Sequence, residues 1–279
     1  MKGYKFMSNY VHGTSPEEQQ RLSLMNDVLL NQACLRELVL RGDERIIDFG
    51  SGLGQFSRTM ARAVPHGQVI GIERDPAQIA AATRLADQHG ERGLVEFRSG
   101  DVLRPDLGAD AGSFDLAHAR FVLEHVPDPL TVVRAMVAAV RPGGRIVLAD
   151  DDHGVMRLWP EPPGFSDLWA AYIRTYDRMG NDPFVGRRLI QLLEQAGAQP
   201  VRNHWLFFGG CAGMDTFPVL AANMAGVVRS ARNLMVEMSL VEELAFDETM
   251  ERYDLWTLRP DAALWFAVAW AEGLRPHEG

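Results

Sequence analysis

The stretch of sequence that decides the fold reads Ile46-Ile47-Asp48-Phe49-Gly50-Ser51-Gly52-Leu53-Gly54-Gln55. Its apolar run predicts a buried strand, and its three glycines predict a tight turn that lets the backbone approach a ligand closely, because glycine has no Cβ. A dinucleotide-binding turn would need its third glycine at the position of Gln55. Asp48 would repel a pyrophosphate but attract an ammonium group, so a ligand with a cationic amino end fits better than NAD. The other interpretation of Asp48 is that it only satisfies backbone donors of the turn.

Short apolar runs alternate with helical stretches on the C-terminal side of this turn, a pattern typical of βαβ units. We expect strands at Arg45–Phe49, Gln68–Glu73, Leu94–Ser99, Phe114–Ala119 and Arg145–Ala149. Helices are expected between them, over residues 55–64, 76–89 and 129–140. Beyond Asp152 the pattern predicts helices over residues 167–179 and 187–195, a strand over Val201–Phe208 and a last buried strand over Ala262–Trp270.

This pattern divides the chain into three parts. Residues 1–42 are expected to form an N-terminal cover segment and a helix, whose start is indicated by Ser15, Pro16 and Glu18. Residues 43–210 together with 259–279 would form the ligand-binding domain. Residues 211–258 are helical in pattern and longer than a connection between neighbouring strands needs, so they predict a helical cap inserted between the last two strands.

Two further acidic residues stand where predicted strands end. Glu73 closes the second strand, and a carboxylate at this position can accept hydrogen bonds from both hydroxyls of a ribose. Asp101 follows the third strand and could accept from the exocyclic amine of an adenine, while the backbone N–H of Val102 donates to a ring nitrogen. Alternatively, Asp101 caps the turn that follows it.

Taken in order and spacing, these motifs resemble those of the class I S-adenosylmethionine-dependent methyltransferases. The similar segments are Asp48 to Gly54, Glu73, Gly100-Asp101, Phe114 to Ala117, Leu123 to Val126 and Arg141 to Arg145. The similarity is closest to the small-molecule subgroup that includes the ubiquinone and menaquinone methyltransferases, and it covers residues 43–152 well. The resemblance implies an α/β fold with a doubly wound, Rossmann-like sheet of seven strands. It also implies that the last strand enters the sheet antiparallel between its neighbours.

S-adenosyl-L-methionine is the cofactor that the resemblance implies. The glycine turn would hold its amino acid end, the tip of the second strand its ribose, and Ala119 with Arg120 its methionine portion and sulfonium. Tyr10 lies in an aromatic segment that would close over the cofactor, unless these aromatic residues only anchor the N-terminus. Ser51 stands where many relatives carry cysteine. The predicted cofactor-binding residues are Tyr10, Asp48, Gly50, Ser51, Gly52, Gly54, Glu73, Arg74, Asp101, Val102, Ala119 and Arg120.

Methyl transfer from a sulfonium depends mainly on alignment and on the exclusion of water, and a general base is needed only for acceptors such as phenols, alcohols or acidic carbons. His153 and His125 both follow strand ends on the side where open α/β sheets bind ligands. His153 is the first candidate base, and His125 is the second, with a structural hydrogen bond as its other interpretation. The run Asp150 to Asp152 could bind a divalent metal, as in catechol-type relatives. Since no further ligand at a fitting spacing is apparent, we predict a solvated loop and no metal.

Composition limits the classes of partner. The 279 residues contain 37 Asp and Glu against 28 Lys and Arg, a net charge of -9, which argues against a protein that binds nucleic acid phosphates. No apolar stretch is long enough for a membrane span, and no secretory signal pattern is present. Cys34 and Cys211 lack the spacing of a disulfide framework or a zinc site, so the reducing cytoplasm is the expected location.

The expected function is therefore methyl transfer from S-adenosylmethionine to an O, N or C atom of a small apolar or aromatic molecule. Several aromatic residues could line the acceptor pocket or belong to the core, namely Trp159, Phe165, Trp169, Tyr172, Phe184 and Trp205. The alternatives are a nicotinamide-dependent oxidoreductase and a catalytically silent scaffold that binds the cofactor. The sequence leaves the acceptor and the oligomeric state open, a homodimer being one option.

Overall fold

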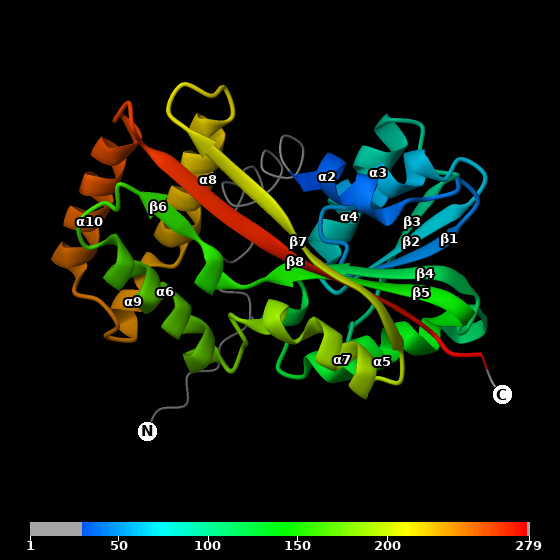
Figure 1. The fold of residues 1–279 in the computed structure, drawn as a ribbon. Coiled ribbons are helices and arrows are strands. Elements are labelled where there is room, and N and C mark those ends of the chain that lie inside the picture. The colour runs from blue at the N-terminus through cyan, green and yellow to red at the C-terminus, as the bar shows by residue number, and fades with distance from the viewer. Residues whose placement is uncertain (1–29, 278–279) are drawn as a thin grey trace.

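The computed structural model describes residues 30–277 as an α/β fold built around one sheet (Figure 1). In this part of the chain eight strands follow the order β3-β2-β1-β4-β5-β8-β6, and β7 also pairs with β8. Their bounds are β1 Arg45–Phe49, β2 Gln68–Glu73, β3 Val95–Ser99, β4 Phe114–Arg120, β5 Val140–Asp151, β6 Arg157–Trp159, β7 Gln199–Cys211 and β8 Ala263–Leu274. β1 to β5 pair in parallel, whereas β8 runs antiparallel to β5 and β7. The antiparallel last strand between its neighbours is therefore confirmed.

The sheet has one strand more than the seven that were expected. β6 is three residues long and pairs with Ala263 to Trp265 of β8, beyond the part of β8 that pairs with β5. Such a short strand leaves no periodic pattern in the sequence, and Pro160 follows it directly. β5 and β6 thus lie one after the other along one edge of β8, while β7 occupies the other edge.

Helices cover both faces of the sheet, as the βαβ pattern predicted. The bounds of the helices on these faces are α2 Asn31–Leu38, α3 Gln55–Ala63, α4 Pro76–Gln88, α5 Pro129–Ala139 and α7 Leu189–Gln195. α2, α3 and α4 pack on one face through a cluster that includes Cys34, Met60 and Ala86 (Figure 1). α5 and α7 pack on the opposite face through Val133 and Leu193. None of the helices within residues 30–277 is long and apolar enough to cross a membrane.

Two of these helices begin at residues that the sequence marks. The side chains of Asp75 and Asp128 accept hydrogen bonds from the backbone N–H groups of Ala77 (2.8 Å) and Thr131 (3.1 Å), and a proline follows each aspartate. These contacts satisfy donors that the first turn of a helix leaves free. The helix predicted from Ser15 is seen only as α2, because its start and the aromatic segment before it lie outside the described residues.

A helical cap stands at one end of the sheet, as predicted for the chain between the last two strands. It contains α8 Phe217–Ser230, α9 Arg232–Glu237 and α10 Glu243–Thr257. α6 Phe165–Met179 packs with them into one apolar cluster, although the sequence pattern placed that helix with the sheet (Figure 1). The cap packs on β6 and on the adjoining ends of β7 and β8. It therefore includes more of the chain than the predicted residues 211–258.

The glycine turn offers a stability test because Gly54 approaches β3 closely. Gly54 has φ +71°, and a Cβ on it would lie 2.3 Å from Cζ of Phe97. Gly90 has the same φ of +71° but nothing within 4 Å of its Cβ position, which makes it a matched control. Gly90→Ala should lose about 1–2 kcal/mol of unfolding free energy from the left-handed backbone alone. Gly54→Ala should lose about 1–3 kcal/mol more from overpacking. Chemical denaturation of both variants measures the difference, and equal losses would contradict the close approach of Phe97.

Candidate functional site

The glycine turn is fixed to the end of the second strand. The backbone N–H groups of Gly50 and Ser51 both donate to the carbonyl of Ile72, at 2.9 and 3.0 Å. The carboxylate of Glu73 accepts from the N–H of Gly52 at 3.0 Å. This places the turn, the end of β1 and the end of β2 at the carboxyl edge of the sheet, where open α/β folds bind their ligands.

Asp48 lies beneath the turn and is 4% exposed. Its carboxylate accepts hydrogen bonds from Oγ of Ser57 (2.5 Å) and from Nδ1 of His118 (2.8 Å). Both partners are side chains, so the alternative that Asp48 satisfies backbone donors of the turn does not describe these contacts. Its expected contact with a cationic amino group stays a prediction.

The two carboxylates predicted to contact the ribose and the adenine each have a free acceptor position. Glu73 accepts from the backbone N–H groups of Arg74 (2.8 Å) and Asp75 (2.9 Å) in addition to Gly52, which leaves about one of the four acceptor positions of a carboxylate. Asp101 is exposed, and its Oδ1 accepts from the N–H of Leu103 at 3.0 Å. Asp101 therefore caps the turn with one oxygen, and its other oxygen remains available for an adenine amine.

The end of β4 carries the next predicted residues. Ala119 is fully buried, while Nη2 of Arg120 donates to Asn31 of α2 at 3.0 Å and the guanidinium lies 4.3 Å from the ring centre of Phe56. The hydroxyl oxygen of Ser51 is buried and has no hydrogen-bond partner within residues 30–277. An unpaired buried hydroxyl in a glycine turn indicates a ligand contact. Tyr10 lies outside the described residues.

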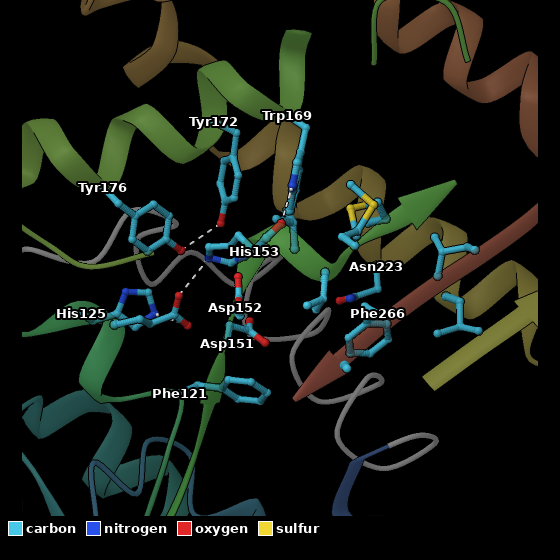
Figure 2. A pocket seen from close by; sticks show the side chains of 18 residues that line it. Phe121, His125, Asp151, Asp152, His153, Trp169, Tyr172, Tyr176, Asn223 and Phe266 are labelled. Atoms are coloured by element: carbon cyan, nitrogen blue, oxygen red, sulfur yellow. Dashed lines mark hydrogen bonds and ion pairs between the residues drawn. The ribbon is translucent and has the colours of Figure 1, made fainter. Parts of the chain in front are cut away.

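A cavity of about 110 Å³ lies between the sheet edge and the cap, and Phe121, the residue that follows Arg120, is part of its wall (Figure 2). Its apolar and aromatic walls come from Phe121, Val155, Met156, Trp169, Tyr172, Tyr176, Leu220, Met224, Val227, Leu264, Phe266 and Ala267. Its polar residues are Glu124, His125, Asp151, Asp152, His153 and Asn223. Figure 2 shows α6 presenting Trp169, Tyr172 and Tyr176 toward His153.

Glu124 is the polar centre of this cavity, although it is only 3% exposed. Its Oε2 lies 3.0 Å from Nε2 of His153, and its Oε1 lies 3.4 Å from Nε2 of His125. Burial raises the pKa of the Glu124 carboxyl to about 8, because the charged form loses its hydration. Glu124 therefore holds a proton at neutral pH.

His153 is held rigidly beside Glu124. Its ring centre lies 5.5, 5.5 and 5.0 Å from those of Trp169, Tyr172 and Tyr176, and Nε1 of Trp169 donates to its carbonyl at 2.9 Å. Burial lowers the pKa of His153, so the imidazole is uncharged at neutral pH and able to accept a proton. Burial lowers the pKa of His125 to about 3, so the imidazole of this second predicted candidate is a very weak base at neutral pH.

The aspartate run is not the solvated loop that the sequence indicated. Asp150 is fully buried, and Asp152 is 4% exposed and pairs with Arg187 through contacts of 2.5 and 2.9 Å. The prediction of a solvated loop is wrong, because partners remote in sequence cover these carboxylates. Burial also raises the pKa of Asp151, which is half-buried at the cavity.

Sequence reasoning missed Glu124, although Glu124 lies in the Leu-Glu-His motif that supported the family resemblance. One oxygen each of Glu124 and Asp151 and one ring nitrogen of His153 lie within 4.8 Å of one another. The fold thus brings Glu124 and His153 close to Asp151, although no further ligand at a fitting spacing is apparent in the sequence, and the prediction of no metal stays a prediction. Of the six aromatic candidates, Trp169 and Tyr172 line the cavity, and Trp159 is 67% exposed on β6.

The sequence and the fold are similar to those of known methyltransferases. Methyltransferase str3 of Strobilurus tenacellus is 30% identical over 157 residues, which is 56% of this chain and 53% of that protein. The ubiquinone biosynthesis O-methyltransferase of Ralstonia nicotianae is 38% identical over 104 residues, which is 37% of this chain and 41% of that protein. The chain thus spans about half the length of the curated relatives it matches.

A solved structure extends the likeness in fold to most of the chain. Geranyl diphosphate C-methyltransferase from Streptomyces coelicolor, in complex with Mg²⁺, geranyl diphosphate and S-adenosyl-L-homocysteine, superposes with a TM-score of 0.53 at 16% identity. The match covers 94% of this chain and 85% of that one. A family profile described as a methyltransferase domain matches residues 19–203, about two thirds of the sequence. The chain belongs to this methyltransferase-domain family.

Proposed function

We propose that the protein transfers the methyl group of S-adenosylmethionine to a small, mainly apolar molecule bound in the cavity of His153. One observation carries the proposal. Arg120, the last residue of the predicted cofactor set, is followed directly by Phe121, which lines the cavity. A cofactor bound along the ends of β1, β2 and β4 would therefore end where the acceptor cavity begins. The net charge of -9 supports a small-molecule acceptor rather than a nucleic acid.

The residues at the sheet edge suit this cofactor. The unpartnered hydroxyl of Ser51, the open acceptor position of Glu73 and the free oxygen of Asp101 offer polar contacts along one line of strand ends. S-adenosylmethionine would supply an electrophilic methyl group on a sulfonium. The protein would contribute alignment of the acceptor and exclusion of water, which can account for most of the rate of such a displacement.

His153 is the proposed proton acceptor. Its imidazole is uncharged, fixed between aromatic rings and hydrogen-bonded to Glu124 through Nε2. When Glu124 is ionised it accepts from the Nε2–H group and keeps the ring in place, which leaves the lone pair of Nδ1 to take a proton. His125 would act as a positioning residue through its contact with Glu124. The cap supplies the apolar walls from α6 and α8, which supports the proposal that it covers the acceptor.

The aromatic N-terminal segment is proposed on its sequence alone to close over the cofactor, with Tyr10 near the cofactor's carboxylate. A cytoplasmic location is proposed on the two cysteines, Cys34 and Cys211, which are free thiols in the described chain.

Ligand binding tests the cofactor. S-adenosylhomocysteine should raise the melting temperature, because a ligand that binds only the folded state adds about 2.7 kcal/mol of stability at a hundredfold excess over Kd. NAD at the same concentration should leave the melting temperature unchanged. A shift with NAD alone, or equal shifts with both ligands, would contradict the assignment.

Glu73→Ala tests the placement of the ribose. The variant should bind S-adenosylhomocysteine more weakly by roughly 1.5 to 3 kcal/mol, because hydroxyl donors lose a charged acceptor. Isothermal titration calorimetry measures the change. Glu194→Ala, which removes an exposed carboxylate from α7, is the control and should keep full affinity. Unaltered affinity in Glu73→Ala would show that the ribose binds elsewhere.

The raised pKa of Glu124 predicts a pH dependence of stability. In the unfolded chain this carboxyl ionises near its ordinary pKa of 4.5, whereas the folded protein keeps it protonated up to about pH 8. Raising the pH between these values therefore stabilises the unfolded state, by about 1.4 kcal/mol per pH unit. Glu124→Gln cannot ionise, so its unfolding free energy should gain up to about 2.7 kcal/mol relative to the native protein between pH 5 and pH 7. Denaturant titrations at both pH values measure this gain, and a constant difference would show that Glu124 is ionised in the folded state.

A further inference from the structure

We propose that the methyl acceptor is an amine, a primary or secondary amino group on an apolar body, and that its nitrogen binds between Glu124 and Asp151. The inference rests on the proposed methyl transfer and adds the chemical class of the substrate. It follows from the distribution of charge around the cavity, from the grouping of three side chains at one point, and from the charge that the reaction creates.

The cavity is lined by acids that lack a cationic partner. Asp152 is neutralised by Arg187, but neither Glu124 nor Asp151 forms an ion pair with an arginine or lysine in the described chain. Among residues 30–277, no arginine or lysine lines the cavity at all. A bound cation would supply what these two carboxyls lack.

Two other buried glutamates of the described chain are paired with arginines. Glu91 is bound by two arginines, with Nε of Arg58 at 2.5 Å and Nη1 of Arg62 at 2.6 Å. Glu272, in β8, is likewise bound by two arginines, Arg145 at 2.9 Å and Arg202 at 3.0 Å. Glu124 has no such partner in the described chain, so it differs from these two glutamates in its pairing.

The two acids without an arginine or lysine partner converge on a point that one small group can occupy. Ligand atoms of Glu124, Asp151 and His153 lie within 4.8 Å of one another, and the carboxylate of Asp151 has no hydrogen-bond partner within residues 30–277. A protonated amino group offers up to three N–H donors, which suits two carboxylate oxygens and one imidazole nitrogen. The aromatic walls, with Trp169 and Phe266 in view in Figure 2, would hold the apolar body and favour a cationic nitrogen near their ring faces.

The charge change of the reaction favours the same class. The bound ammonium first gives one proton to His153, which passes it to solvent. The lone pair of the resulting neutral amine forms the new bond to the methyl carbon, and the carbon–sulfur bond breaks with its electron pair staying on sulfur. The positive charge thereby moves from sulfur to nitrogen, where the carboxylates of Glu124 and Asp151 would stabilise it. The product leaves as a methylated ammonium ion, so atoms and charge balance with the one proton released. A bound cation would favour the ionised form of both acids, whereas a phenolate in the same place would disfavour it and would be repelled by either acid once ionised.

Matched amine and alcohol probes test the inference. The pairs are 2-phenylethylamine with 2-phenylethanol, and tryptamine with indole-3-ethanol, each titrated into the full chain that has been saturated with S-adenosylhomocysteine. The amine of each pair should bind at least tenfold more tightly than the alcohol. Glu124→Gln and Asp151→Asn should each reduce this ratio toward one. Asp177→Asn, which removes an exposed carboxylate from the same helix as Tyr176, should keep the ratio.

The outcomes separate this inference from the proposed function. Failure to bind S-adenosylhomocysteine would contradict the proposed function, whereas normal binding of that ligand with equal affinities for amine and alcohol would overturn only the amine class. No saturable binding of either amine would overturn it as well. Binding of catechol that requires Mn²⁺ and disappears with EDTA would overturn it in favour of a metal held by the same three side chains. The comparison of amine with alcohol uses the native chain, so it tests the amine class of the acceptor even if Glu124→Gln fails to fold.

Discussion

The carboxylate of Asp150 joins the ends of β4 and β5, and the cavity is organised around this contact. Its oxygens accept from the backbone N–H groups of Val122 (3.1 Å), Leu123 (2.8 Å) and Asp151 (3.1 Å), within a fully buried setting. The chain reaches this turn through Phe121, which adopts a left-handed backbone conformation at φ +55° and donates its N–H to the carbonyl of Ala149 at 3.0 Å. A bulky residue holds such a conformation only where its surroundings enforce it. Asp150 thereby fixes the direction in which Glu124 enters the cavity and the spacing between Glu124 and His153.

The proposed cofactor side and the proposed acceptor side of the site are formed by different parts of the chain. The cofactor side is formed by backbone groups and residues at the ends of strands, and it lies within residues 19–203, which match the family. The acceptor side takes its walls partly from α8 and β8, which lie beyond that match. A fold can keep its cofactor site while the pocket for the second substrate changes, because function depends on side chains placed on a common scaffold. The family match therefore supports the proposed cofactor side more than it supports any particular acceptor.

The sequence predicts the fold well wherever the signal is local. β1 and β2 have the expected bounds because each is a short apolar run closed by a turn or an acidic residue, whereas β6 was missed because three residues carry no period. The family resemblance, not periodicity, gave the direction of β8. The site was harder to predict, because burial of a carboxylate depends on its partners. Asp150 is buried by backbone groups 27 and 28 residues away, and Asp152 by Arg187, 35 residues away. No pattern within one segment reveals such contacts.

Glu124 and Asp151 lack the arginine partners that Glu91 and Glu272 have, and this lack lowers the stability of the folded protein at a pH above the ordinary pKa of a carboxyl. Elsewhere in the described chain, arginines pair with the buried carboxylates of Glu91 and Glu272. An arginine beside Glu124 and Asp151 would pair with these carboxyls, yet it would also repel a nitrogen that carries positive charge during methyl transfer. Buried ionisable groups with displaced pKa values and no cationic partner are typical of functional sites for this reason. The positive charge that Glu124 and Asp151 lack among the described residues is the charge that the proposed amine acceptor would bring to them.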